Sequence, residues 1–386
     1  MGASSKRASG EEHPQEEKAF GRIQSLLRDP VGSLKKADKP ILGWLCCYTP
    51  LEIILAAGVN PYRVIPEPTS DMADSFLHSN FCPFVRSSLA KALKGELDFL
   101  DGCVLVNSCD GLRRLYDAWR LYAKTPRIYF IDLPRISTET AVRRFRETLI
   151  GFKGSLEQWI GCPISGGQIN DAIVQSDRGR RLLKELYVLR KNHTLPLSGS
   201  QVFDVVRGEM VLPKEEYLGL LERLVDEIKQ GVSISNMKDL PRVMITGSLL
   251  EDSRIADLVE ESGGKVVCDD LCTGSRYFWD SVQPFEEPLL SLSRYYLSKI
   301  PCARMMDFTR RIDHVMDLVA EFEIHGVICY TLKFCDTFLY DVPLLKKRLD
   351  ARKIPSLFLD SDYTPGSMGR IKTRIEAFLE LLREHV

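Results

Sequence analysis

The chain has 386 residues, of which 44% are hydrophobic and 27% charged, and its formal net charge is −1. This composition is typical of a folded protein of two domains, not of a disordered or fibrous chain. The near-zero charge provides no basic field for nucleic acid or an anionic membrane, and no apolar run reaches the roughly 18 residues of a membrane-spanning helix.

The beginning of the chain is polar and charged and lacks the apolar stretch of a secretory signal. We therefore expect residues 1–36 to form a flexible N-terminal tail and the protein to be cytoplasmic. The sequence contains eleven cysteines, which a reducing compartment would keep from forming disulfides. Buried thiols, metal ligands or a nucleophile remain as roles for them.

The first structured region, residues 37–137, alternates short apolar strands with helices. Strands are expected at 41–48, 62–65, 103–106 and 127–131, and helices at 51–57, 87–100 and 112–123. Pro50 precedes the first of these helices, a position that proline favours. Strands that alternate with helices predict a parallel sheet covered by helices.

The middle region, residues 138–238, shows only helical spacing of its apolar residues and is expected to be a helical bridging segment. Its helices are expected at 138–159, 171–190 and 214–230. The α/β pattern returns in residues 239–386, with strands expected at 242–246, 265–268, 327–331 and 356–359, and helices at 252–261, 310–322, 344–351 and 369–383. The predicted fold is therefore α/β, with two flavodoxin- or Rossmann-like domains with parallel sheets, joined by a helical segment.

The two α/β regions resemble copies of one another. In each, an apolar strand leads into a Cys-Asp pair, Cys109-Asp110 in the first region and Cys335-Asp336 in the second, and a helix follows. Any two strand–helix units look alike, but that similarity does not explain a matched Cys-Asp at the turn. We infer an internal duplication.

Six cysteines fall in loops that we expect near the carboxyl ends of strands, where open parallel sheets bind ligands. They are Cys47 (or its neighbour Cys46), Cys82, Cys109, Cys272, Cys302 and Cys335. Three others lie within apolar strands and are expected in the core, namely Cys103, Cys268 and Cys329, while Cys162 lies in the helical region.

These six cysteines are far apart in the sequence, so they form no compact zinc motif. Soft thiolates with little histidine nearby favour an iron–sulfur cluster. A 4Fe-4S cluster takes up to four thiolates, so two sets of three would suit two cubanes, each with one open iron. On residue types alone, buried free thiols remain the alternative.

The segment Gly43-Trp-Leu-Cys-Cys-Tyr-Thr-Pro50 resembles the opening motif of the 2-hydroxyacyl-CoA dehydratase and benzoyl-CoA reductase family. Five further segments resemble later motifs of the family, in the same order along the chain: Cys82–Ser88, Ser108–Asp117, Leu197–Ser200, Phe334–Asp336 and Lys372–Phe378. The resemblance implies a 4Fe-4S cluster on Cys82, Cys109 and Cys335. It also implies electrons from an ATP-dependent iron–sulfur activator protein, and a CoA-thioester substrate.

Two further segments, Asp269–Phe278 and Pro301–Arg304, resemble the double-cubane branch of this family. That branch implies a double-cubane 8Fe-9S cluster, with Cys47 or Cys46, Cys272 and Cys302 as additional ligands, and activity as a small-molecule reductase. Alternatives are a subunit of a dehydratase or benzoyl-CoA reductase, and a non-catalytic electron-relay or scaffold subunit. Either a homodimer or a heterodimer with a homologous subunit is expected, without nucleic acid or membrane as a partner.

Residues beside the proposed ligands have simpler explanations. We expect Asp110 and Asp336 to cap the helices that follow them, and Ser198 to belong to a helix-capping turn. Three arginines either offset cluster charge or bind CoA phosphates, or are ordinary surface residues: Arg86, Arg113 and Arg114. The six histidines show no pairing, and no catalytic residue is assigned.

Overall fold

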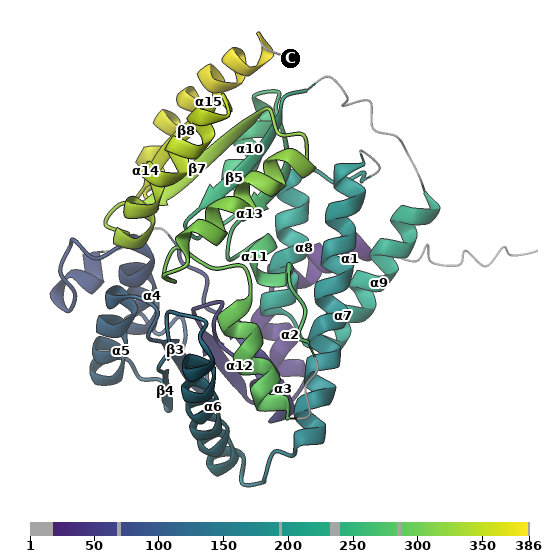
Figure 1. Ribbon diagram of the computed structural model, residues 1–386. Coiled ribbons are helices and arrows are strands. Elements are labelled where there is room, and N and C mark those ends of the chain that lie inside the picture. The colour runs from purple at the N-terminus through teal and green to yellow at the C-terminus, as the bar shows by residue number, and fades with distance from the viewer. Residues whose placement is uncertain (1–17, 68–70, 193–194, 232–239, 284–286, 385–386) are drawn as a thin grey trace, which may run out of the picture.

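The computed structural model describes residues 18–67, 71–192, 195–231, 240–283 and 287–384. Two four-stranded sheets organise this part of the chain, and every strand pair within them is parallel. The strand order is β2-β1-β3-β4 in the first sheet and β6-β5-β7-β8 in the second. Figure 1 shows the second sheet above the first, with a column of helices beside both.

The first sheet consists of β1 (Ile41–Trp44), β2 (Asn60–Arg63), β3 (Gly102–Val106) and β4 (Ile128–Ile131). The helices α3 (Leu51–Ala56), α4 (Pro83–Leu93) and α5 (Asp110–Tyr122) connect its strands. Every residue of β1 and β3 is buried, as expected for central strands covered by helices on both faces.

The second sheet consists of β5 (Arg242–Gly247), β6 (Lys265–Asp270), β7 (Gly326–Leu332) and β8 (Ser356–Ser361). Its helices are α10 (Arg254–Glu261), α13 (Phe308–Glu321), α14 (Asp336–Ala351) and α15 (Met368–Arg383). Both sheets have the same strand order, and the third strand of each, β3 or β7, leads into the Cys-Asp pair. This match agrees with the inferred duplication.

Among the described residues, four helices lie between the two sheets in the sequence: α6 (Glu139–Ile160), α7 (Gly166–Lys191), α8 (Gly199–Val211) and α9 (Lys214–Gln230). Helix α7 contacts α3 of the first domain and β6 of the second, so it bridges them. The short α11 (Ser275–Phe278) and α12 (Pro288–Ser298) follow the second sheet's β6, and α12 packs back against α6 (Figure 1). Two 3₁₀ turns complete the elements, Asp71–Ser75 and Pro365–Ser367.

The prediction of a flexible tail over residues 1–36 is wrong for residues 19–36, which form α1 (Ala19–Arg28) and α2 (Pro30–Lys36). The buried side chains of Ala19, Ile23 and Leu26 share one face of α1, which packs against α8 and α9. This apolar stripe contains only three residues and ends before Pro30. Its periodicity is therefore too weak to indicate a helix from the sequence. Residues 1–17 lie outside the described residues.

The predicted α/β class, with two parallel-sheet domains of Rossmann-like form, is confirmed. Besides α1 and α2, three helices were missed, namely α8, the short α11 and α12. Helix α14 begins at Asp336, well before the predicted start at 344, because the helix continues through Pro343. Helix α8 is rich in valine and contains Gly208, which weaken a helical signal. The described part of the chain has no helix with the length and apolarity needed to cross a membrane.

Candidate functional site

Three cysteines from both domains come together at the edges of the two sheets; we call them the first thiol group. Cys109 and Cys335 are the N-cap residues of α5 and α14, directly after the carboxyl ends of β3 and β7. Cys82 is the N-cap residue of α4, where Pro83 begins the helix. The thiol of Cys82 donates a hydrogen bond to that of Cys335 and lies in the field of Cys109.

Four further cysteines form a second thiol group, made of Cys46, Cys47, Cys272 and Cys302. Cys46 and Cys47 follow β1 of the first sheet, whereas Cys272 follows β6 of the second. Their thiols form a hydrogen-bonded chain in which Cys272 donates to Cys47 and Cys47 donates to Cys46. Cys302 is tied to the same place because its backbone N–H donates to the Tyr48 hydroxyl at 3.0 Å.

The guanidinium of Arg304 lies between the two thiol groups. Its Nη1 atom donates to Sγ of Cys302 at 3.3 Å. Burial alone would lower the pKa of Arg304, but the nearby thiols of Cys109, Cys302, Cys335 and Cys46 raise it well above the usual range. One cation therefore stands within electrostatic reach of members of both groups.

The environment separates the pKa values of these thiols. The hydrogen bond from Cys82, together with the charge of Arg304, lowers the pKa of Cys335 to about 5, while that same bond and burial raise the pKa of Cys82. The hydrogen bond from Cys272 lowers the pKa of Cys47. The bond that Cys47 donates to Cys46, together with the burial of Cys47, outweighs this effect, so that the pKa is raised to about 11. In both groups, hydrogen bonds between neighbouring thiols therefore favour the thiolate form of one cysteine over that of another.

Buried arginines surround the second thiol group. Arg63, at the end of β2, donates from Nη2 to Sγ of Cys272 at 3.1 Å. Arg276, which is 2% exposed, donates from Nη2 to the carbonyl oxygen of Gly247 at 2.9 Å and lies in the field of Cys302, Cys272 and Cys47.

Some of these buried donors lack acceptors. Among the described residues, Nε of Arg63, Nη1 of Arg276 and Nε of Arg304 have no hydrogen-bond partner. Buried polar groups are nearly always satisfied, so orphaned cationic donors next to thiols indicate space for an anionic group. An iron–sulfur cluster is negatively charged and its sulfur atoms accept hydrogen bonds, so this set of donors fits one.

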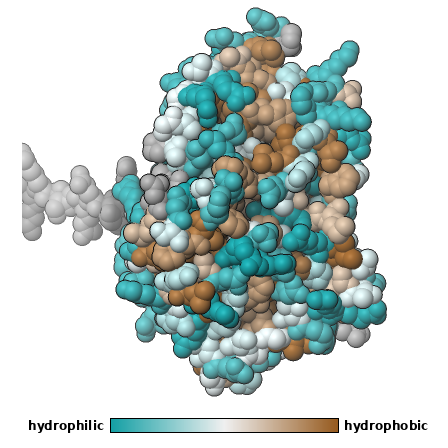
Figure 2. Space-filling view, turned by 90° about the vertical axis from the view of Figure 1, so that its left-hand side faces the viewer, coloured by the Kyte–Doolittle hydropathy of each residue, from teal (hydrophilic) through white to brown (hydrophobic). Residues whose placement is uncertain are grey.

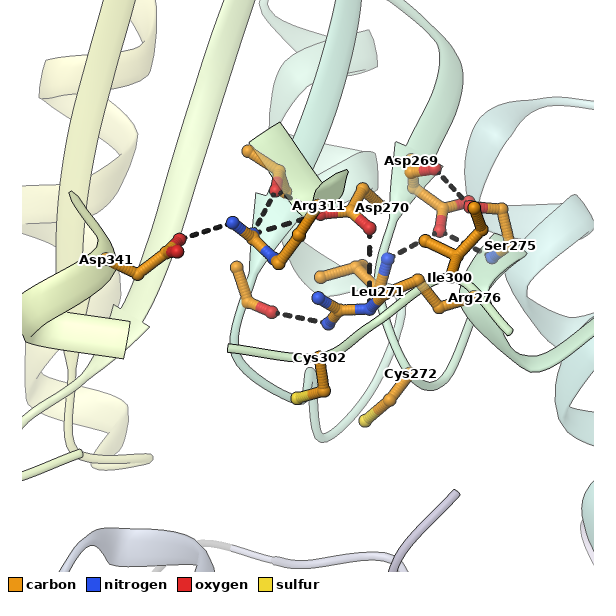
Figure 3. A network of polar contacts seen from close by, with 12 residues as sticks. Asp269, Asp270, Leu271, Cys272, Ser275, Arg276, Ile300, Cys302, Arg311 and Asp341 are labelled. Carbon is orange, nitrogen blue, oxygen red and sulfur yellow. Dashed lines mark hydrogen bonds and ion pairs between the residues drawn. The ribbon is translucent and has the colours of Figure 1, made fainter. Parts of the chain in front are cut away.

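A network of buried charged side chains lies next to Cys272 and Cys302 of the second thiol group (Figure 3). Asp270 is fully buried; its Oδ2 lies 3.0 Å from Nη2 of Arg311, and its Oδ1 lies 3.4 Å from Nε of Arg276. Arg311 also pairs with Asp341 of α14. Since Cys335 is the N-cap residue of α14, the network joins the loop of Cys272 to the helix that follows a member of the first group.

A cavity of about 480 Å³ opens beside the first thiol group and is lined by all three of its cysteines and by Arg135 and Arg304. Its rim includes Phe334, which is 46% exposed. Other large apolar side chains exposed on α14 are Leu339, Tyr340 and Leu344. Figure 2, which faces the side where α14, α4 and α5 lie in Figure 1, shows apolar surface between polar residues.

The family model for the 2-hydroxyglutaryl-CoA dehydratase D-component matches residues 46–382. The chain belongs to this family. The family predicted from the sequence motifs is thereby confirmed.

Relatives of the 2-hydroxyglutaryl-CoA dehydratase D-component family align over nearly the whole chain. A putative dehydratase subunit, YjiM, of Escherichia coli is 27% identical over 91% of this chain and 94% of its own length. The (R)-2-hydroxyglutaryl-CoA dehydratase subunit beta of Acidaminococcus fermentans is 27% identical over 94% and 98%. A benzoyl-CoA reductase subunit of Thauera aromatica is 26% identical over 90% and 93%.

The remaining cysteines of this family member lie away from both thiol groups. Cys103, Cys268 and Cys329 are buried within β3, β6 and β7, as predicted, and burial raises the pKa of each, that of Cys329 to about 12. Cys162 is exposed. Among the described residues, no group of three or more His, Cys, Asp and Glu side chains could hold a single metal ion. A cluster differs in that each thiolate binds a different iron.

The other predicted residues have structural partners. Ser198 forms a capping box with Gln201 at the start of α8, as expected for a helix-capping turn. The expectation that Asp110 and Asp336 are helix caps is wrong, because the cysteine before each is the N-cap and the aspartate is the first helical residue. There its carboxylate still faces the positive end of the helix dipole.

Each of the three arginines considered from the sequence contacts a nearby polar side chain. Arg86 pairs with Asp74, and Arg113 donates to the side-chain oxygen of Asn107. Nη1 of Arg114 lies 2.9 Å from Oδ2 of Asp117. These contacts agree with the interpretation of Arg113 and Arg114 as ordinary surface arginines, whereas the side chain of Arg86 is only 15% exposed.

Sequence reasoning missed the cations that contact the thiol groups, namely Arg63, Arg276, Arg304 and Lys299. Two signals pointed to them. Arg63 lies within a predicted strand, 62–65, near the edge where ligands of parallel sheets bind. Arg304 comes two residues after Cys302.

Proposed function

We propose that this chain is an iron–sulfur protein that accepts low-potential electrons from an ATP-hydrolysing activator and passes them to a bound substrate. The observation that carries the proposal is the convergence of seven thiols from both domains around buried guanidinium groups with unsatisfied N–H donors. A core of inert thiols would not need these cations, as the buried Cys103 illustrates: it lies in a strand among apolar residues.

The first thiol group, Cys82, Cys109 and Cys335, would hold one 4Fe-4S cluster. The second would hold another through Cys272, Cys302 and either Cys47 or Cys46, which together would make a double-cubane 8Fe-9S cluster. A cluster with an open iron position supplies one-electron chemistry at low potential.

The protein's own residues would stabilise such a group. Arg63, Arg276 and Arg304 would offset its negative charge and donate hydrogen bonds to its sulfur atoms, which raises the stability of the reduced state. The buried position of most of the thiols would exclude water and oxygen from the irons. Low surrounding dielectric strengthens each of these contacts.

A second candidate function is a subunit of a dehydratase or reductase that acts on CoA thioesters. The names of the relatives favour it, because two of them are a beta subunit of a 2-hydroxyglutaryl-CoA dehydratase and a subunit of benzoyl-CoA reductase. Here the chain would pair with a homologous subunit, and in one version it would only relay electrons or act as a scaffold. In all versions we propose a cytoplasmic, oxygen-sensitive protein.

The test is anaerobic purification followed by iron and sulfide analysis and EPR spectroscopy. About eight irons per chain would support two cubanes and about four would support one. Cys82→Ala should remove iron from the first group, and Cys272→Ala or Cys302→Ala from the second. The control is Cys329→Ala, which removes a buried thiol within β7. Equal iron content in all four variants, or none in the parent protein, would overturn the proposal.

Assembly and partner are tested separately. The purified chain is mixed with an ATP-hydrolysing iron–sulfur activator, and reduction of the cluster is followed by EPR spectroscopy. Reduction of the cluster by the activator when this chain is the only other protein present favours a homodimeric reductase. Reduction that requires a second, homologous subunit favours the CoA-thioester enzyme.

A further inference from the structure

A second large cavity, of about 650 Å³, lies away from the thiols, between the helical segment and α12. Its walls come from the start of α6, from α7, from the residues after α11 and from α12. Its volume is within the range of small-molecule binding sites. No cysteine lines it, so it is distinct from the cavity beside the first thiol group.

The lining of this cavity is rich in positive charge. Its cations are Arg180, Arg181, Lys184, Arg294 and Lys299, against the two acids Glu139 and Asp280. Arg180 is already neutralised by Glu52 and Asp177. Arg181, in contrast, is exposed and makes no ion pair or hydrogen bond to another described residue. The cavity therefore has uncompensated charge to offer an anion.

Apolar and aromatic surface lies beside these charges. The lining includes Phe278, Trp279, Tyr295 and Leu297. Nζ of Lys184 lies 4.8 Å from the centre of the Trp279 ring. A site with aromatic walls and a few convergent cations suits an organic molecule that has an apolar body and one anionic end.

Lys299 connects this cavity to the second thiol group. It lines the cavity, is 4% exposed, and donates from Nζ to the carbonyl oxygen of Cys47 at 3.3 Å. Three aromatic rings surround its ammonium group, with their centres 5.5 to 5.7 Å from Nζ: those of Tyr48, Tyr295 and Tyr296. An occupant that contacts Lys299 is therefore one side chain away from the loop of Cys47.

We propose that this cavity binds the substrate, an organic anion whose carboxylate or phosphate group contacts Arg181 and Lys299 and whose apolar body lies against Trp279. The assignment of the occupant as the substrate rests on the proposed function, since electrons would reach it from the cluster proposed at the second thiol group. Binding of the anion itself requires only the folded chain.

The test uses benzoate and phenylphosphate as anionic probes and benzyl alcohol as a neutral molecule of similar shape. Binding is followed by quenching of tryptophan fluorescence, and a Trp279→Phe variant identifies the reporter. We expect both anions to bind and benzyl alcohol not to bind. Arg181→Ala should weaken binding about tenfold, the usual effect of losing one charge-assisted hydrogen bond. Arg178→Ala is the matched control, because Arg178 is an exposed residue of the same helix that pairs with Glu222.

Equal affinity for benzyl alcohol, or unchanged affinity in both Arg181→Ala and Lys299→Met, would overturn the inference. The measurement is made on the chain with and without iron, which separates the two proposals. Anion binding to a chain that never holds iron contradicts the proposed function only. A loaded cluster whose EPR signal and tryptophan fluorescence are both unaffected by either anion contradicts the inference only.

Discussion

The guanidinium of Arg63 donates to two atoms of Cys272, from Nη1 to the carbonyl oxygen at 2.6 Å and from Nη2 to Sγ at 3.1 Å. Arg63 ends a strand of the first sheet, and Cys272 follows a strand of the second. The ring of Trp44 lies 4.7 Å from the guanidinium carbon and packs against it. One buried side chain thus joins the domains at the second thiol group.

Replacing Arg63 with lysine should lower the reduction potential of the proposed cluster. Lysine keeps the charge but cannot donate to both atoms of Cys272 in the same way. A loss of about 1.4 kcal/mol of stabilisation of the reduced state corresponds to about −59 mV for one electron. The measurement is a redox titration followed by EPR, with Arg113→Lys as the control, since Arg113 contacts Asn107 on the surface. An unchanged potential with full iron content would contradict the assigned role of Arg63.

Asp341→Asn should destabilise the protein strongly. It removes a negative charge from the network that Asp341 forms with Arg311, Asp270 and Arg276. Each of these four residues is 5% exposed or less. Breaking a buried ion pair on one side costs about 3–5 kcal/mol. The free energy of unfolding, measured in urea, should fall by an amount of this order.

The control for that variant is Asp350→Asn on the same helix. Asp350 pairs with Lys346, and both side chains are more than half exposed. A solvated pair of this kind contributes less than about 1 kcal/mol. Similar losses in the two variants would show that the buried network has no special role in stability.

Glu251 predicts a dependence of stability on pH. Burial raises the pKa of this carboxyl to about 7, although the Tyr330 hydroxyl donates to it at 3.1 Å. The folded protein therefore holds a proton that the unfolded chain releases near pH 4.3. The stability that this proton contributes, up to roughly 3 kcal/mol, is fully present below that pH and is lost as the pH rises through about 7.

The check is urea unfolding of the wild type and Glu251→Gln at pH 5 and pH 8. Glutamine does not ionise, so the variant should lose less stability over this interval than the wild type. Parallel pH profiles of the two proteins would show that Glu251 titrates normally.

Gly247→Ala should also be destabilising. Gly247 has a φ angle of +129°, and an added Cβ atom would lie 1.9 Å from the backbone oxygen of Tyr330. Strain of this kind costs at least roughly 1–3 kcal/mol, and here it would also move the carbonyl that accepts from Arg276. Gly151→Ala is the opposite case, because the Cβ meets nothing within 4 Å on α6, and a gain of about 0.5–1 kcal/mol is expected. Thermal unfolding of both variants measures the difference.

Local patterns were enough to predict the strands and the position of Cys109 and Cys335. Each of these residues follows a buried apolar strand and precedes a helix, so its place at a sheet edge follows from the chain direction. The position of Cys302 follows from no such rule, because α12, which precedes it, was not predicted. The capping box of Ser198 and Gln201 could have revealed α8 despite its valines.

The contacts between domains could not be predicted from the sequence. The bond from Arg63 to Cys272 depends on how the two sheets are placed relative to each other, and no periodicity within either segment encodes that placement. The same is true of Lys299 and the carbonyl oxygen of Cys47. The adjacent Cys46 and Cys47 both belong to the hydrogen-bonded thiol chain, so which of them would bind a cluster stays a prediction.

The first thiol group has a consequence for biosynthesis. Cys82 and Cys109 leave the ribosome early, whereas Cys335 emerges only after the second sheet's first three strands have been made. No nascent chain can complete the site before that point, and until then the early thiols stand open to oxidants. Insertion of the proposed cluster would therefore have to come late in synthesis or after it, and a cell that makes this protein would need to keep the early thiols reduced until then.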